Sequence, residues 1–82
     1  MSKIEKEQEY LKSLIFFMQE RVKFLTTSIV EHEKEIKENE GYANGVYKGL
    51  LMAKQDEIDF LQSYIDYFSN KLKENNDSNK AV

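Results

Sequence analysis

The chain of 82 residues contains no proline, cysteine or tryptophan, and its three glycines all lie within residues 41–49. The absence of cysteine excludes disulfides and thiolate metal sites, so the fold depends on its own core or on a partner. Proline and glycine are the residues that break helices, and outside that one segment the chain has neither. The longest apolar run, LIFFM at residues 14–18, is far shorter than the roughly 20 residues that span a bilayer. We therefore expect a small helical protein of the cytoplasm.

Basic residues are too few and too scattered for a nucleic-acid site. The chain has 12 Lys and Arg against 15 Asp and Glu, a net charge of −3. Residues 28–40 hold five Glu and two Lys, so this stretch alone accounts for the net charge. Without a basic stripe to neutralise phosphates, DNA binding is the least favoured of the functions considered. The abundance of Lys, Asn, Ile and Glu is typical of AT-rich genomes, phages among them.

Two heptad patterns predict two long helices. In the first, the two apolar rows are Ile15, Val22, Ile29 and Ile36, and Ile4, Leu11, Met18, Leu25 and His32. In the second, they are Leu51, Ile58, Ile65 and Leu72, and Tyr47, Lys54, Leu61 and Phe68. Rows of this spacing form the seam of a coiled coil. The sequence predicts helices over about residues 3–39 and 44–74, a turn at about 40–44, and a disordered tail over 75–82.

The two patterns differ in phase by one residue, which a turn explains and a continuous helix does not. Gly41 suits the left-handed position that ends a helix, and Asn44 is a candidate N-cap for the next. A turn near residue 42 pairs residues whose numbers sum to about 83. We predict an all-α antiparallel helical hairpin; a long parallel dimer is the alternative, because β-branched residues in one row and leucine in the other suit parallel strands.

A second apolar surface lies beside the seam. Its ten members occupy the flanking c and g heptad positions of both helices and are here called the aromatic face: Tyr10, Leu14, Phe17, Phe24, Val46, Leu50, Ala53, Phe60, Tyr64 and Tyr67. In an antiparallel pair these positions merge on one side, and the other side is polar. We expect the face to be covered, either by a second hairpin in a homodimeric four-helix bundle or by a different protein.

The remaining glycines allow two interpretations. Gly45, Gly49 and Ala53 form a four-residue ladder of small side chains near the turn. The helix begins loosely there, or the ladder permits close approach of a second chain or a ligand.

Two polar residues interrupt the seam. His32 is either a partly exposed seam histidine or a pH-sensitive contact. Lys54 is expected to extend outward or to pair with Glu57, and in either case to influence register or partner choice.

Two further surface sites are candidates for binding. Near the turn, an acidic and apolar tip site for a protein partner would consist of Val30, Glu31, Glu33, Glu35 and Met52. A site for a small anion such as a nucleotide would consist of Tyr42, Tyr47, Lys48 and Lys54.

No pattern in the sequence indicates an enzyme, a metal site or a cofactor. There is no nucleophile and base set, and the glycine spacing fits neither a P-loop nor a dinucleotide fingerprint. The favoured hypothesis is a protein–protein interaction module, a small adaptor or inhibitor such as a phage or mobile-element accessory protein, that modulates an unidentified partner. The alternatives are an oligomeric bundle that sequesters a small anion and, last, a DNA-binding accessory protein.

Overall fold

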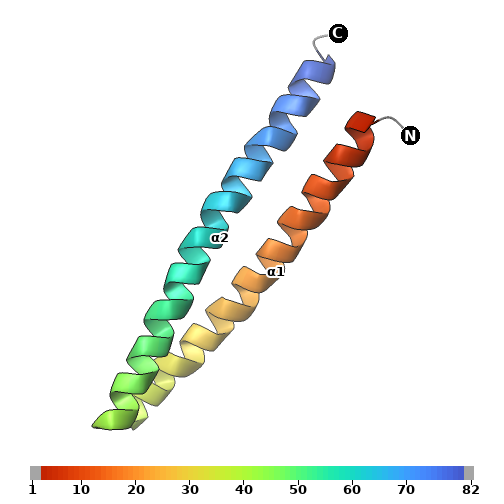
Figure 1. Ribbon diagram of the computed structural model, residues 1–82. Coiled ribbons are helices and arrows are strands. Elements are labelled where there is room, and N and C mark those ends of the chain that lie inside the picture. Colours follow the sequence, from red (N-terminus) through yellow and green to blue (C-terminus); the bar gives the residue numbers. More distant parts are fainter. Residues whose placement is uncertain (1–2, 81–82) are drawn as a thin grey trace.

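The computed structural model describes residues 3–80, with side chains described for residues 3–74. It is an antiparallel hairpin of two helices, α1 (Lys3–Glu38) and α2 (Tyr42–Lys80) (Figure 1). The molecule is a rod with extents of 62 × 18 × 13 Å. The all-α hairpin predicted from the heptads is confirmed, and the alternative of one continuous helix is wrong.

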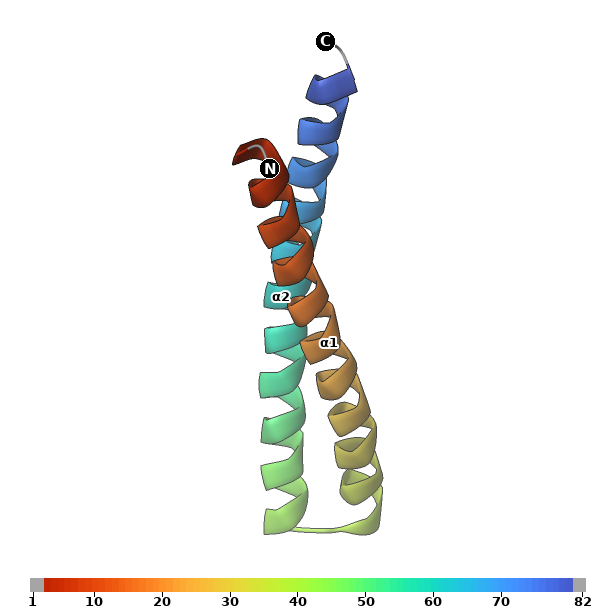
Figure 2. The same cartoon turned by 90° about the vertical axis from the view of Figure 1, so that its right-hand side faces the viewer.

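The helices wind gradually around each other. In Figure 1 the two helices are separated near the termini and overlap near the turn. In the perpendicular view of Figure 2 they are separated near the turn and overlap near the termini. A seam that repeats every seven residues produces such winding, because 3.5 residues per turn is slightly less than the 3.6 of a straight helix.

The turn is formed by Gly41, whose φ of 68° lies in the left-handed region. A side chain at this φ would clash with the backbone, which explains why glycine stands here. The carbonyl of Gly41 accepts a hydrogen bond from the N–H of Gly45 at 3.3 Å, so α2 already begins at Tyr42, two residues before the predicted start.

Asn44 caps the other helix. The expectation that it is the N-cap of α2 is wrong, because it lies inside the first turn of α2. Its side-chain amide donates to the carbonyl oxygens of Ile36 at 2.8 Å and Asn39 at 3.2 Å. These carbonyls at the end of α1 have no partner within the helix, and Asn44 supplies one from across the turn.

The C-terminal end of α2 also differs from expectation. The helix continues to Lys80, beyond the predicted end at residue 74, so the predicted tail is helical over 75–80. Residues 75–80 contain neither glycine nor proline, and Asn, Asp and Ser lower helix propensity by only a few tenths of a kcal/mol. The rest of the predicted tail, residues 81–82, lies outside the described residues.

The seam holds the small core. Every seam position from Leu11 to Ile36 and from Tyr47 to Leu72 is buried or half-buried. Among residues 3–74, only Leu25, Ile29 and Ile65 are buried, and Leu25 is fully so. Two helices can enclose a side chain only along their line of contact, so most of the remaining apolar surface stays open to solvent.

A polar contact crosses the seam near the turn. The Lys54 ammonium donates to the Ser28 hydroxyl and, at 2.8 Å, to Nε2 of His32. An ammonium group has donors only, so in this contact the ring nitrogen stands on the accepting side. The His32 ring also packs on Tyr47, with centroids 5.8 Å apart. The expected pairing of Lys54 with Glu57 is not formed, because Ser28 and His32 lie across the seam within its reach.

Candidate interaction surface

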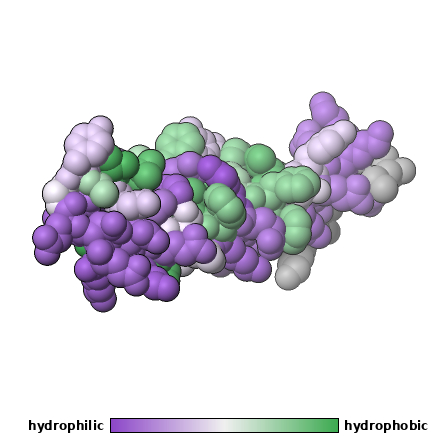
Figure 3. Space-filling view, turned by 90° about the horizontal axis from the view of Figure 1, so that it is seen from below, coloured by the Kyte–Doolittle hydropathy of each residue, from purple (hydrophilic) through white to green (hydrophobic). Residues whose placement is uncertain are grey.

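All ten residues of the aromatic face are exposed, in contrast to the seam beside them. Tyr10 is 75% exposed and Phe17 is 68% exposed, which are high values for such large apolar side chains. In the view from below of Figure 3, hydrophobic residues form patches along the rod, with hydrophilic residues between them. A patch of this kind marks an interaction surface more often than ordinary solvent-facing surface.

Contacts between rings order the part of the face that α2 supplies. Phe60 and Tyr64 have ring centroids 4.8 Å apart, and Phe68 packs against Tyr64 at 6.0 Å and against Tyr67 at 5.4 Å. Phe68 belongs to the seam and is half-buried, so it anchors the two tyrosines from beneath. Ring pairs at these distances are favourable beyond the area that they bury. This part of the surface is therefore arranged before any partner binds.

An ion pair joins the two helices within the aromatic face. Arg21 Nε donates to Oε2 of Glu57 at 2.7 Å, and its Nη2 donates to Oε1 at 3.3 Å. The hydrogen bond to Glu57 raises the pKa of Arg21, and the hydrogen bond from Arg21 lowers the pKa of Glu57. The guanidinium also lies 5.2 Å from the centroid of the Phe24 ring, a cation–π arrangement.

Sequence reasoning missed this ion pair, although a signal for it was present. Arg21 and Glu57 occupy g positions, which lie on the same side of an antiparallel hairpin, and their charges are opposite. Their numbers sum to 78, within about five of the predicted 83, and long side chains can bridge such an offset. The heptad analysis considered the apolar positions and did not compare the charges at the g positions of the two helices.

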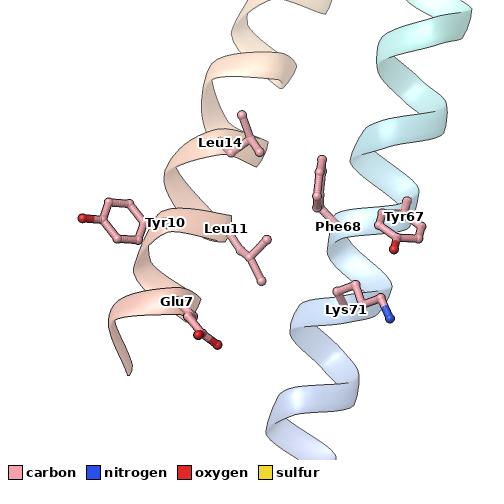
Figure 4. A pocket seen from close by; sticks show the side chains of 7 residues that line it. All are labelled: Glu7, Tyr10, Leu11, Leu14, Tyr67, Phe68 and Lys71. Atoms are coloured by element: carbon pink, nitrogen blue, oxygen red, sulfur yellow. The ribbon is translucent and has the colours of Figure 1, made fainter. Parts of the chain in front are cut away.

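The face continues into a groove of about 430 Å³ between the helices at the end away from the turn. In Figure 4, Leu11 and Phe68 point toward each other between the helices, and Tyr10 points away from α2. The groove is completed by Leu14, Tyr67, Glu7 and Lys71. Its lining is mainly apolar, so it suits an apolar side chain presented by a partner.

The predicted tip site is exposed in most of its members. Val30 is 60% exposed and Met52 is 66% exposed, on different helices. Glu31 and Glu33 are exposed as well. Glu35 is half-buried, and its carboxylate accepts a hydrogen bond from the side chain of Asn39 at 3.1 Å, so it takes part in ending α1.

The residues predicted to hold a small anion point to different surroundings. Tyr42 is 90% exposed beside the turn, and Lys48 is exposed on the polar side. Tyr47 packs on His32 in the seam, and Lys54 donates to Ser28 and His32. The structure shows no contact that joins all four residues among those it describes.

Gly45 and Gly49 lie in open space. A β-carbon added at either position would meet nothing within 4 Å, so the ladder of small residues is not used for contact between α1 and α2. Within the described part of the chain, no helix is long and apolar enough to cross a membrane, and no group of three or more His, Asp or Glu side chains could hold a metal ion.

Comparison with protein-family models, with curated proteins and with solved structures found no match for this chain.

Proposed function

We propose that this chain is a non-enzymatic protein–protein interaction module, a small adaptor or inhibitor whose aromatic face is covered by another protein chain. One observation carries the proposal: ten apolar positions on one side of the hairpin stand exposed, beside a seam that is buried or half-buried from Leu11 to Ile36 and from Tyr47 to Leu72. The exposed half of each side chain contributes about 1 kcal/mol when it is buried, so the face offers roughly 10 kcal/mol before association costs. A solvent-facing role alone does not account for that driving force.

The module is proposed to work as a homodimer in which two hairpins stack their aromatic faces into a four-helix bundle. The hairpin supplies only half of the surface that such a core needs, and symmetric self-association is the commonest way to complete it. The exposed tip site near the turn would then remain available to a different protein.

Site-specific photo-crosslinking in the source cell tests the interaction function. A photoreactive residue replaces Phe17, at the centre of the α1 part of the face, and in a separate variant it replaces Gln19, which is exposed on the polar side. Crosslinked protein, either the chain itself or another, is expected at position 17 and not at position 19. Equal labelling at the two positions, or none at position 17, overturns the proposal.

Circular dichroism of both variants shows whether each remains helical, so that loss of crosslinking is not confused with loss of the fold. Phe17→Glu gives a second test that needs no photoreactive group. It places a charge in the face while leaving the seam intact, so helicity is expected to persist while complexes captured through the face disappear. Gln19→Glu is the matched control.

A further inference from the structure

The Arg21–Glu57 ion pair occupies the middle of the aromatic face. Across the hairpin, both residues hold g positions, which border the seam between the helices. Along the hairpin, the face residues divide around the pair. Toward the termini lie Tyr10, Leu14, Phe17, Phe60, Tyr64 and Tyr67, and toward the turn lie Phe24, Val46, Leu50 and Ala53. A bidentate pair without net charge thus lies between the two apolar parts of the face.

The exposed area of the face matches what a second copy would cover. Six of the ten side chains are aromatic and 44–75% exposed, so at about 150–250 Å² each when fully accessible they together offer roughly 700 Å². The four smaller side chains add to this, so the face reaches about the 800 Å² per partner of a stable interface of standard size. A second copy of the chain therefore carries a surface of the size that the face needs.

Stacking two identical faces requires a two-fold axis that lies between them, directed either along the helices or across them. With the axis along the helices, α1 of one copy lies over α2 of the other at the same height. With the axis across them, heights are inverted about the middle of the face. The ion pair lies at the middle of the face, so either axis brings the two pairs together. Only the axis along the helices places Arg21 of each copy over Glu57 of the other, whereas the axis across them places like charges over each other.

We propose that two hairpins associate through their aromatic faces about a two-fold axis directed along the helices, with Arg21 of each copy facing Glu57 of the other, so that the four charges neutralise one another and set the arrangement of the dimer. This assembly rests on the interaction module proposed above. Any other register would press a charged pair against apolar side chains of the partner, which removes its hydration without replacing it. The central pair thereby favours the arrangement in which opposite charges face each other over the one in which like charges do.

Complementary charge variants test the proposal. Arg21→Glu leaves two carboxylates at the centre of the face, and Glu57→Arg leaves two guanidinium groups. Each variant alone brings four like charges to the axis of its homodimer, so its dimer Kd is expected to rise about tenfold or more. An equimolar mixture restores two charges of each sign, so a heterodimer close to wild-type affinity is expected. Sedimentation equilibrium gives the Kd values, and native mass spectrometry identifies the heterodimer.

Mixing separates interchain from intrachain effects. Both variants lose the ion pair within the hairpin, and mixing cannot restore that loss, so recovery upon mixing reports only on contacts between chains. Glu20 and Lys23 are the matched control. They form an exposed pair at 3.2 Å on the far side of α1, and the single variants Glu20→Lys and Lys23→Glu are expected to dimerise like wild type.

The outcomes also distinguish this inference from the function on which it rests. If both variants dimerise as tightly as wild type, or the mixture recovers nothing, the ion pair does not lie at the axis, and the inference is overturned while self-association stands. If wild type is monomeric throughout the concentration range, the second copy is not the occupant. A partner crosslinked at position 17 would then still support the interaction module.

Discussion

Replacing Gly49 with alanine tests whether the surface of α2 next to the turn is open. Gly49 is helical, and the added methyl group meets nothing within 4 Å, so the substitution changes helix propensity alone. Alanine is favoured over glycine inside a helix by about 1 kcal/mol, because glycine loses more backbone entropy on folding. Gly45 lies in the first turn of α2, where the gain is smaller, and the double variant is expected to be more stable by about 1.5–2 kcal/mol.

Replacing Gly41 with alanine is expected to change the stability of the hairpin in the opposite direction. Space is equally open there, but φ is 68°, and the left-handed region costs a residue with a β-carbon about 1–2 kcal/mol. Gly41→Ala should therefore destabilise the hairpin, while Gly49→Ala should stabilise it. The contrast isolates backbone conformation from packing, since neither methyl group touches a neighbour.

Thermal unfolding followed by circular dichroism at 222 nm measures these effects. For a domain of 60–100 residues, 1 kcal/mol corresponds to about 4–8 °C in Tm, so the double variant should melt roughly 6–16 °C above wild type. All variants must be compared at one protein concentration, because self-association raises Tm by mass action. A lower Tm for Gly45→Ala or Gly49→Ala would show that another chain or ligand lies against the small-residue ladder, and the reasoning would fail.

Three other predictions follow from individual side chains. Leu25→Ala removes a fully buried side chain and should lower the free energy of unfolding by about 3 kcal/mol in urea titrations. Lys54→Leu replaces a half-buried ammonium in the seam with an apolar side chain and should raise the stability by about 1 kcal/mol in the same assay. The pKa of Glu57 lies below the ordinary carboxyl value because Arg21 donates to it, so Arg21→Gln should raise that pKa in an NMR titration of side-chain carboxyl carbons.

The sign of the pH effect follows from the lowered pKa of Glu57. The ion pair stabilises the hairpin at pH values above the ordinary carboxyl pKa, and this contribution is lost as pH falls through the pKa of folded Glu57.

An unchanged Glu57 pKa in Arg21→Gln would mean that the two side chains do not pair in solution. A loss of stability in Lys54→Leu would mean that the contacts with Ser28 and His32 stabilise more than the burial of leucine does. A change below about 1 kcal/mol for Leu25→Ala would place the core elsewhere.

Much of the hairpin could be predicted from residue spacing because the relevant interactions are local. A seven-residue repeat determines which side of a helix is apolar, and the predicted seam positions from Leu11 to Ile36 and from Tyr47 to Leu72 are buried or half-buried. Ile4, the first predicted seam position, is 48% exposed. The register followed from the turn: His32 was predicted opposite Leu51, and it contacts Tyr47 and Lys54, which flank that position. The ten apolar positions of the aromatic face were separated from the seam by the same spacing argument.

The wrong predictions concern polar side chains that have several possible hydrogen-bond partners within reach. Asn44 has the side chain of an N-cap, yet the turn at Gly41 places it beside the unpaired carbonyls of α1. Lys54 was expected to extend outward or to pair with Glu57 on its own helix, but its ammonium group contacts Ser28 and His32 across the seam. The predicted end of α2 at residue 74 was too early. The polar segment that follows was expected to be disordered, although its residues 75–80 contain neither glycine nor proline and are helical.

The sequence by itself determined the two helices, the position of the turn and the apolar seam, because each depends on side chains a few residues apart along one helix or on the backbone freedom of one glycine. The tertiary structure decided the partners of Arg21, Asn44 and Lys54. Those contacts depend on the stagger and winding of α1 against α2, and a shift of a single helical turn replaces one set of polar neighbours with another. The central ion pair of the aromatic face therefore became visible only when the two helices were placed side by side.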